Sequence, residues 1–369
     1  MQRVANHSWS DLFTPSEPTA SPASTQTFRV LRKHGEPLLM LPASAGLAAQ
    51  ALSLYPAQSR LARMARFALR QALRWGLPVT AERAEAPVAS TGKFAEFLRG
   101  LAGSETFPHL AILAGNPRQQ GRRFLILVFS PQDRPAAVVK AGMGQAAREL
   151  ILLEGSFLKS VPAGTPGIPR LREEFESEQL CAFALDFAPG DSPRRCIGSE
   201  VADLMMAWLD QGRSLEVKEL TAWKQLADAR NPLFTRLEKQ LSGKQLHPAL
   251  THGDFAPWNV KVAPDGRWVV LDWERGQLKG PPAWDWFHFV IQPAILVEKL
   301  SLNALARKIE GLLISPAFQR YANAAGFSGW EREWLLTYLL YCREVIKPAE
   351  GLPEASRLLE TLASQWPAN

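Results

Sequence analysis

The sequence predicts an α+β protein in which a strand-rich part precedes a helix-rich part. Two observations support this prediction. Short apolar segments separated by Gly and Pro dominate residues 105–187, whereas amphipathic helical patterns dominate residues 188–369, apart from a strand-turn-strand pattern at 249–273. The run Ala188-Pro189-Gly190 interrupts both patterns, so we expect a hinge near residues 187–190.

The composition is that of an ordinary globular protein. Of the 369 residues, 46% are hydrophobic, and 12 Trp and 18 Phe supply core material. The three cysteines show no C-x-x-C spacing, which favours a reducing, cytoplasmic location and indicates no zinc site. The first residues contain no apolar run of the kind that a signal peptide needs. The net charge of +6 suits phosphate-bearing partners but selects none of them.

Two segments precede the strand-rich part. Residues 1–26 are rich in Ser, Thr and Pro, so we expect a mobile tail. Residues 27–104 are expected to form an N-terminal helical extension, because the pattern from 43 to 77 is helical. Arginines recur there at steps of three and four, at Arg60, Arg63, Arg66, Arg70 and Arg74. The opposite face is expected to carry Leu61, Met64, Ala68, Ala72 and Trp75.

This basic amphipathic helix has more than one interpretation. No Asp or Glu occurs from Pro37 to Ala81. The apolar face could dock on the rest of the protein, which we favour, or the helix could contact an anionic membrane surface peripherally, or an acidic partner. Nucleic acid is not expected, because stacking aromatics are not interleaved with the arginines. Prolines at 42 and 56 argue against a membrane-spanning helix in the uncharged run 37–59.

An antiparallel meander is expected in the strand-rich part. Apolar strands are predicted at 109–113, 123–129 and 136–140, with turn residues between them. A helix over 145–160 follows, and then a pair of strands that ends at Phe187. The second part is expected to end in helices around 295–312 and 330–346.

The strongest chemical signal is the segment from His252 to Asn259, which fits the pattern H-x-D-x-x-x-x-N. An apolar strand ends at Asp272, thirteen residues after Asn259. Phosphoryl transfer needs one carboxylate to orient a hydroxyl and accept its proton, for which Asp254 is suited. It also needs oxygen ligands for Mg²⁺, which Asn259 and Asp272 can provide. The turn at 263–266 would bring these two ligands together.

Alternative explanations for this segment are weaker. Asp254 and Asn259 could merely cap turns between buried strands. A metallophosphoesterase would need further histidine-bearing motifs, and the remaining histidines show no such pattern.

The segment from Leu250 to Val290 resembles the aminoglycoside phosphotransferase and choline kinase family. The similarity rests on His252-Gly253-Asp254, on Asp272-Trp273-Glu274 and on Pro282-Ala283-Trp284-Asp285. It implies a two-lobed protein-kinase-like fold, with a small antiparallel-sheet N-lobe over 105–187 that binds nucleotide and a mainly helical C-lobe over 188–369 that carries the catalytic loop. It also implies ATP and Mg²⁺ as cofactors.

The resemblance assigns roles to further residues. Lys140 is expected to contact the ATP phosphates and to pair with an acidic residue, for which Glu154 is preferred over Glu149. The loop from Gly115 to Gly121 should cover the phosphates, although it lacks G-x-G-x-x-G. His252 and Asp285 are expected to support the catalytic loop structurally.

We therefore expect an ATP-dependent phosphotransferase that acts on a hydroxyl of a small molecule or glycan. A strongly cationic acceptor is not favoured, since residues 281–369 hold nine acidic and eight basic side chains. The alternative is a nucleotide-binding, pseudokinase-like regulatory module. A protein kinase is not favoured, because no Ala-Pro-Glu follows Asp272. The sequence makes no prediction of oligomeric state.

Overall fold

The chain forms two compact units. The computed structural model describes residues 8–13, 24–77, 79–88, 92–115, 121–193, 198–346 and 353–366. The first unit comprises residues 1–160 and 169–188, and the second comprises residues 161–168 and 189–369. This is the protein-kinase-like α+β fold that the resemblance implies.

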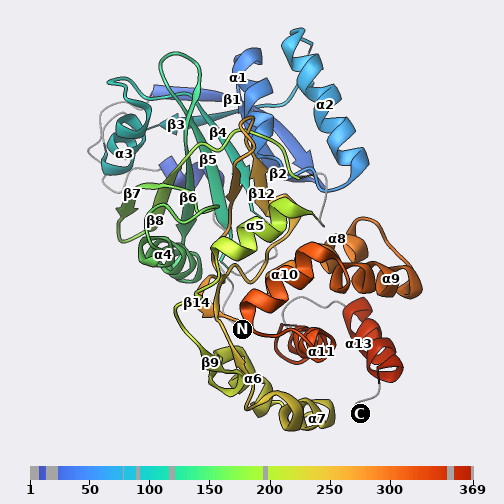
Figure 1. The fold of residues 1–369 in the computed structure, drawn as a ribbon. Coiled ribbons are helices and arrows are strands. Elements are labelled where there is room, and N and C mark those ends of the chain that lie inside the picture. The colour runs from blue at the N-terminus through green and yellow to red at the C-terminus, as the bar shows by residue number, and fades with distance from the viewer. Residues whose placement is uncertain are drawn as a thin grey trace, which may run out of the picture. The chain divides into compact units, whose positions relative to one another are not determined.

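An antiparallel sheet of eight strands forms the centre of the first unit, with the order β3-β1-β2-β4-β5-β6-β8-β7 (Figure 1). Its strands are β1 (Ser24–Lys33), β2 (Glu36–Pro42), β3 (Arg83–Val88), β4 (Leu110–Ala114), β5 (Arg123–Phe129), β6 (Pro135–Met143), β7 (Leu171–Glu176) and β8 (Leu180–Asp186). Strands β4, β5 and β6 pair as consecutive antiparallel neighbours, which confirms the predicted meander.

Alternating side chains give this sheet two apolar faces. Ile112 points into a cluster with the short helix η1 (Trp9–Phe13) and helix α3 (Lys93–Ala102). Leu113, the next residue, points into a cluster on the other face, with helix α1 (Ala45–Ala51) and Leu73 of helix α2 (Arg60–Arg74). Because successive side chains of a strand point to opposite faces, the sheet is buried on both sides. Helix α4 (Gln145–Ser160) packs on β6 and β8.

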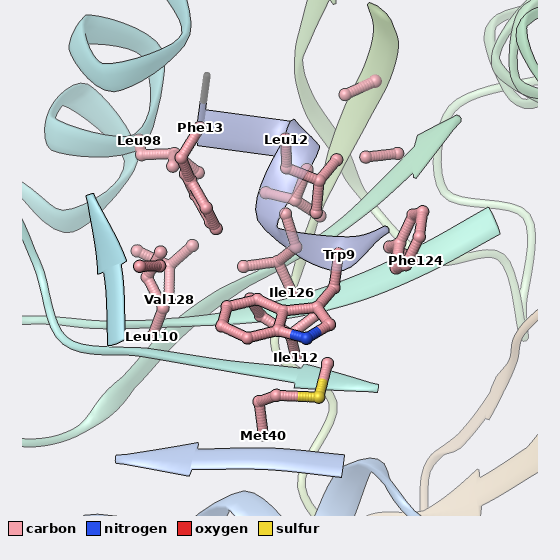
Figure 2. Close-up of a cluster of buried hydrophobic side chains, with 14 of the residues drawn as sticks. Trp9, Leu12, Phe13, Met40, Leu98, Leu110, Ile112, Phe124, Ile126 and Val128 are labelled. Carbon is pink, nitrogen blue, oxygen red and sulfur yellow. The ribbon is translucent and has the colours of Figure 1, made fainter. Parts of the chain in front are cut away.

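The prediction of a mobile tail over residues 1–26 is wrong for the described residues 8–13. Trp9, Leu12 and Phe13 are buried, and the Trp9 ring meets the Phe28 ring edge-on at 5.3 Å. Figure 2 shows these side chains pointing into the same cluster as Met40. Large aromatic side chains bury enough apolar surface to order a short segment despite its polar neighbours.

The predicted N-terminal extension is also more than a helical addition. Residues 24–42 and 83–88 form β1, β2 and β3, and β2 pairs with β4. The extension therefore enlarges the sheet of the first unit. The predicted helix over 43–77 is present as α1 and α2, with the helix η2 (Leu52–Leu54) and residues 55–59 between them. Pro56 interrupts the helix because proline lacks the backbone N–H that a helix needs.

The second unit is mainly helical. Its helices are α5 (Ser199–Ala207), η3 (Val217–Glu219), α6 (Thr221–Asp228), α7 (Pro232–Leu241), η4 (Pro257–Asn259), α8 (Trp284–Leu296), α9 (Leu302–Leu313), α10 (Pro316–Ala325), α11 (Glu331–Tyr341), the π-helical η5 (Cys342–Ile346) and α13 (Pro353–Gln365). In its described residues, strands pair as small antiparallel ribbons: β9 (Leu215–Glu216) with β10 (Gln245–Leu246), β11 (Ala249–Thr251) with β14 (Gln277–Gly280), and β12 (Val260–Val262) with β13 (Trp268–Val270).

The predicted hinge residues lie where the chain enters the second unit. Gly190 has φ of 119°, and an added Cβ would lie 2.0 Å from the carbonyl oxygen of Val262. The next residue accepts a hydrogen bond from the Val262 N–H at 2.8 Å. Only glycine fits this close approach, so the chain is held to β12 immediately after the hinge.

Candidate active site

The predicted catalytic loop lies between β11 and β12. The turn at 263–266 closes the β12–β13 hairpin, in which Gly266 N–H donates to the Ala263 carbonyl at 2.9 Å. Directly beyond the paired strands, the Leu271 N–H donates to the Asn259 carbonyl at 2.7 Å. The hairpin therefore brings the segment before Asp272 against Asn259, as the sequence predicts.

Asp254 and Asn259 are in direct contact. The Asn259 Nδ2 group donates to the Asp254 carbonyl at 2.9 Å and to Asp254 Oδ2 at 3.1 Å. With its amide nitrogen engaged in this way, Asn259 presents its Oδ1 atom, an acceptor only, to other groups. An amide oxygen in such a position is a suitable ligand for a hard cation.

Asp272 adopts an unusual backbone conformation. Its φ is 72°, in the left-handed region that few residues other than glycine adopt. Asp tolerates this conformation better than most residues, and such strain is frequent at functional sites. The side chain is partly buried, and the residue lies one position beyond the backbone link between Leu271 and Asn259.

His252 joins the catalytic loop to the segment before Asp272. Its ring is buried, and Nε2 lies 2.9 Å from the Leu271 carbonyl oxygen, which can only accept. Its Nδ1 accepts the Asp254 N–H at 3.1 Å. These two contacts require the neutral tautomer with its proton on Nε2. Both ring nitrogens are thus engaged with the backbone, and the supporting role of His252 stays a prediction.

Asp285 holds the start of the loop from the side of α8. Its carboxylate accepts the His252 N–H at 2.5 Å and the Gly253 N–H at 2.9 Å. Burial raises the pKa of Asp285, although the neighbouring His252 ring and the two backbone donors oppose the shift. Both carboxylate oxygens are thus used to fix the loop backbone, and the predicted role in structural support stays a prediction.

The sequence reasoning missed His288, which contacts Asp254 directly. His288 lies on α8, is 5% exposed, and places Nε2 3.0 Å from Asp254 Oδ1. Its Nδ1 lies 2.9 Å from the hydroxyl group of Tyr338 on α11. Since a carboxylate only accepts, Nε2 carries a proton and donates to Asp254. The one signal in the sequence was its spacing of three residues from Asp285, one turn along the same helix.

His288 also sets the charge state of Asp254. Burial would raise the pKa of the Asp254 carboxyl, but the hydrogen bond donated by His288, with the positive charge of Arg275 nearby, outweighs it. The pKa of Asp254 therefore lies below its ordinary value, and the carboxylate is ionised at neutral pH. Both Asp254 oxygens are oriented, Oδ1 by His288 and Oδ2 by Asn259.

A pocket of about 340 Å³ opens beside these residues within the second unit. Gly253 and His288 line it where it approaches Asp254. The other lining residues include the aromatic side chains of Trp284, Tyr338 and Tyr341. Polar and charged lining residues are Thr251, Arg275, Gln277 and Asp285.

Lys140 and Glu154 form a buried ion pair in the first unit. Lys140 Nζ donates to Glu154 Oε2, and the two side chains are 10% and 2% exposed. Glu149, the other candidate partner, lies on the exposed side of α4 and accepts from Gln145 Nε2 at 3.0 Å. The structure thus pairs Lys140 with Glu154, while the contact of Lys140 with ATP phosphates stays a prediction.

The predicted phosphate-covering loop is only partly described. Gly115 approaches the backbone of Arg123 so closely that an added Cβ would lie 2.5 Å from its carbonyl oxygen. Gly121 has φ of 81° and begins the turn into β5. Residues 116–120, which should approach the phosphates, lie outside the described residues. A role of Gly115 and Gly121 in cofactor binding therefore stays a prediction.

The ligand set offered to a metal is small. In the described part of the chain, no group of three or more His, Cys, Asp and Glu side chains is arranged to hold a metal ion. Asn259 and Asp272 offer one amide oxygen and one carboxylate. Mg²⁺ commonly binds proteins through one or two such oxygens and completes its shell with water and substrate phosphates. The donor set therefore fits Mg²⁺ bound together with a nucleotide.

Comparison with known proteins places most of the chain in one family. The model of the phosphotransferase enzyme family matches residues 17–332. No curated protein matches the sequence.

Several solved structures are similar in fold. A thermostable mutant of the aminoglycoside phosphotransferase APH(4)-Ia, in complex with ADP and hygromycin B, is 14% identical, with a TM-score of 0.47 over 75% of this chain and 100% of that chain. A putative fructosamine-3-kinase from Haemophilus somnus is 12% identical, with a TM-score of 0.45 over 73% and 96%. Choline kinase from Cryptosporidium parvum is 11% identical, with a TM-score of 0.39 over 69% and 87%.

Proposed function

Because the chain belongs to the phosphotransferase enzyme family, we propose that it transfers the γ-phosphate of ATP to a hydroxyl group of a small molecule or glycan, with Asp254 as the base. Membership of the family makes the chain an ATP-dependent phosphotransferase with an alcohol group as acceptor. The identity of the base, the metal ligands and the type of acceptor are our proposals.

One observation carries the assignment of Asp254. Its carboxylate is ionised, with one oxygen bound to His288 and the other bound to Asn259. A general base must be deprotonated at the working pH and held in one orientation toward the hydroxyl that it activates. Asp254 meets both requirements, whereas Asp285 uses both of its oxygens on backbone N–H groups. Asp254 is also 32% exposed in its side chain, so a hydroxyl can reach it.

Asn259 and Asp272 would hold the magnesium ion. Mg²⁺, when bound with ATP, neutralises charge on the phosphates during transfer. The chain contributes the orientation of its ligands: Asp254 fixes the Asn259 amide, and the Leu271–Asn259 backbone bond fixes the approach of Asp272. In the first unit, Lys140 would contact the α- and β-phosphates, held in place by Glu154.

The acceptor would bind in the pocket lined by Trp284, Tyr341 and Gln277. The lining residues His288 and Gly253 support this placement of the acceptor. His288 contacts the Asp254 carboxylate, and Gly253 precedes Asp254 in the sequence. Among the lining residues that the structure describes, Asp285 is the one carboxylate, and its oxygens are already occupied. An acceptor with many ammonium groups would find no unoccupied carboxylate among these described lining residues, while aromatic walls suit the apolar face of a sugar ring.

The proposal is tested with a panel of sugars, polyols, sugar acids and amino sugars, scored by Mg²⁺-dependent release of ADP. We expect turnover with a neutral or anionic hydroxyl compound, and a fall in kcat of about 10²–10⁴-fold in Asp254→Ala. Asp265→Ala is the matched control, because Asp265 lies in the exposed β12–β13 turn and pairs with Arg267. Nucleotide binding without turnover on any acceptor would contradict the proposal and favour a regulatory module.

A test of the pocket uses Gln277→Ala. We expect a higher KM for the acceptor identified by the panel and an unchanged dissociation constant for the nucleotide, since Gln277 lines the pocket. An unchanged acceptor KM would place the acceptor elsewhere.

A further inference from the structure

Helix α2 carries large apolar side chains that the described part of the chain leaves exposed. Leu61, Met64, Phe67 and Trp75 are 78%, 68%, 63% and 76% exposed, and Leu77 just beyond the helix is 50% exposed. Large apolar side chains exposed in this number along one helix are unusual for a soluble protein and mark an interaction site. The favoured expectation, that this face docks on the rest of the protein, is therefore wrong.

The helix is instead held by a third face. Leu73 is fully buried, and Leu69 packs against the apolar cluster that also contains residues of α1. Ala62, which lies between these two residues when the helix is viewed along its axis, is half-buried. Ser59 caps the first turn by accepting the Ala62 N–H at 3.1 Å. Figure 1 shows α2 beside α1 in the first unit. The helix is thus anchored on its inner side, and its outer side is free for a partner.

Two parallel stripes cover this outer side. Successive helical residues are rotated by about 100°, which places Leu61, Met64, Ala68 and Trp75 within an arc of about 60°. By the same geometry Arg60, Arg63, Arg70 and Arg74 fall within a neighbouring arc of about 80° that also includes Phe67, and all four arginine side chains are exposed. The arginines therefore lie next to the apolar stripe, and not opposite it as expected from the sequence pattern. We call this outer side the α2 surface.

No acidic residue offsets the arginines along this part of the chain. Asp and Glu are absent from residues 37–81, and the next acid, Glu82, pairs with Arg32 in a two-pronged contact at 2.7–3.0 Å. The α2 surface therefore combines a fixed positive potential with a long apolar stripe. A partner that fits both must offer anionic groups and an apolar layer directly next to them.

We propose that the α2 surface docks the protein on an anionic phospholipid bilayer. Arginines would contact lipid phosphates, and the apolar stripe would enter the boundary between headgroups and acyl chains, parallel to the membrane plane. Trp75 at the end of the helix suits this boundary, where Trp is enriched in membrane proteins. Across the described ranges, no helix is both long and apolar enough to span a bilayer.

Two other occupants fit less well. A second copy of this chain would bring two rows of arginines together when the apolar stripes meet, and like charges would repel. An acidic protein could pair with the arginines. A bilayer fits better, because its layer of phosphates lies directly above an apolar layer along the whole length of the helix, as the two stripes require. This inference does not depend on the proposed phosphoryl transfer.

The experiment is sedimentation of the full chain with vesicles of phosphatidylcholine alone or with added phosphatidylglycerol. We expect binding to the anionic vesicles, little binding to the neutral ones, and weakening as salt is raised, because salt screens the arginine contacts. Equal binding to both vesicles, or binding to neither, would overturn the proposal. So would binding to anionic vesicles that salt does not weaken.

Two variants locate the contact. Arg63→Gln/Arg70→Gln/Arg74→Gln should lower the partition coefficient by about fivefold for each arginine, if each contributes as surface cations usually do. Leu61→Ser/Met64→Ser should lower it by about tenfold or more. These side chains are exposed, so the thermal midpoint should not change.

Matched controls remove the same chemistry elsewhere. Arg307→Gln/Arg320→Gln removes two exposed arginines, and Ile314→Ser removes an apolar side chain that is 77% exposed. We expect vesicle binding equal to that of the wild type. Loss of binding in these controls equal to that in the α2 variants would overturn the proposal, as would α2 variants that abolish self-association and leave vesicle binding unchanged.

Discussion

The buried pair of Lys140 and Glu154 makes a quantitative prediction about stability. The two side chains are 10% and 2% exposed, and the lysine donates directly to the glutamate. Lys140→Met keeps most of the side-chain volume but leaves the Glu154 charge buried without this partner. Removing one member of a buried ion pair usually costs about 3–5 kcal/mol of unfolding free energy, because the remaining charge is not compensated.

A matched surface pair serves as the control in the same unit. Lys159 donates to Glu174 at 2.5 Å, but the two side chains are 55% and 37% exposed. Because water and salt screen exposed charges, Lys159→Met should cost no more than about 1 kcal/mol. The contrast between the two lysines therefore measures burial, since the substitution is the same.

A double variant distinguishes the cost of an unpaired buried charge from the cost of losing the ion pair as a whole. Lys140→Met/Glu154→Leu removes both charges and replaces them with apolar groups. We expect it to be more stable than Lys140→Met alone, since well-packed apolar groups can replace a buried ion pair at little cost.

The assay is urea unfolding followed by circular dichroism. Titration calorimetry with Mg-ATP runs in parallel, and we expect weaker nucleotide binding in both variants of Lys140. A cost below about 1 kcal/mol for Lys140→Met, or a double variant less stable than the single one, would refute the reasoning.

Three further predictions follow from the contacts of individual side chains. His288→Leu should move the acidic limb of the kcat/KM profile to higher pH, because the group that lowers the pKa of Asp254 is lost while the burial that raises it remains; an unmoved limb would separate His288 from the base. Asp285 has a raised pKa in the folded state, so the wild type should lose stability as pH rises from the ordinary value of 3.8 through the raised value. The uncharged variant Asp285→Asn should lack this loss when both proteins are unfolded in urea at a series of pH values. The same dependence of stability on pH in both proteins would contradict the prediction. Trp9→Ala should destabilise the first unit by about 3–5 kcal/mol in thermal unfolding, because Trp9 is 8% exposed and packs on Phe28. A loss of less than about 1 kcal/mol would instead support the prediction that this segment is mobile.

The catalytic segment could be predicted because its functional residues and its turn lie close together in the sequence. The spacing from Asp254 to Asn259 and the tight turn at 263–266 are short-range features, and a turn of that kind leaves few ways to pair the flanking strands. The meander of β4, β5 and β6 was predictable for the same reason, since neighbouring strands with short connections pair with each other.

The strands of the N-terminal segment could not be placed so easily. In β1, apolar Phe28 and Val30 alternate with polar Thr27 and Arg29, and His34 with the following glycine turns the chain into β2. This alternation was a usable signal. The pairing of β2 with β4, however, joins segments about 70 residues apart, and such contacts depend on the tertiary core that forms between them.

His288 shows the same limit within the site. A histidine in a very apolar helix is usually part of the core, and nothing in its local sequence reports the position of Asp254. Its role depends on how α8 packs against the catalytic loop, which only the folded unit determines. The exposure of the apolar stripe on α2 is a similar case, because the sequence gives both stripes but not the face by which the helix is held.

The most direct test of the proposed reaction follows the γ-phosphate itself. The purified protein is incubated with Mg²⁺, ATP labelled at the γ-position and the acceptor found by the panel, and label in the acceptor is compared with label in free phosphate. We predict a stable phosphate monoester on an acceptor hydroxyl, with transfer by Asp254→Ala at a rate about 10²–10⁴-fold lower. Label that appears only in free phosphate, or transfer by Asp254→Ala at the rate of the wild type, would contradict the account.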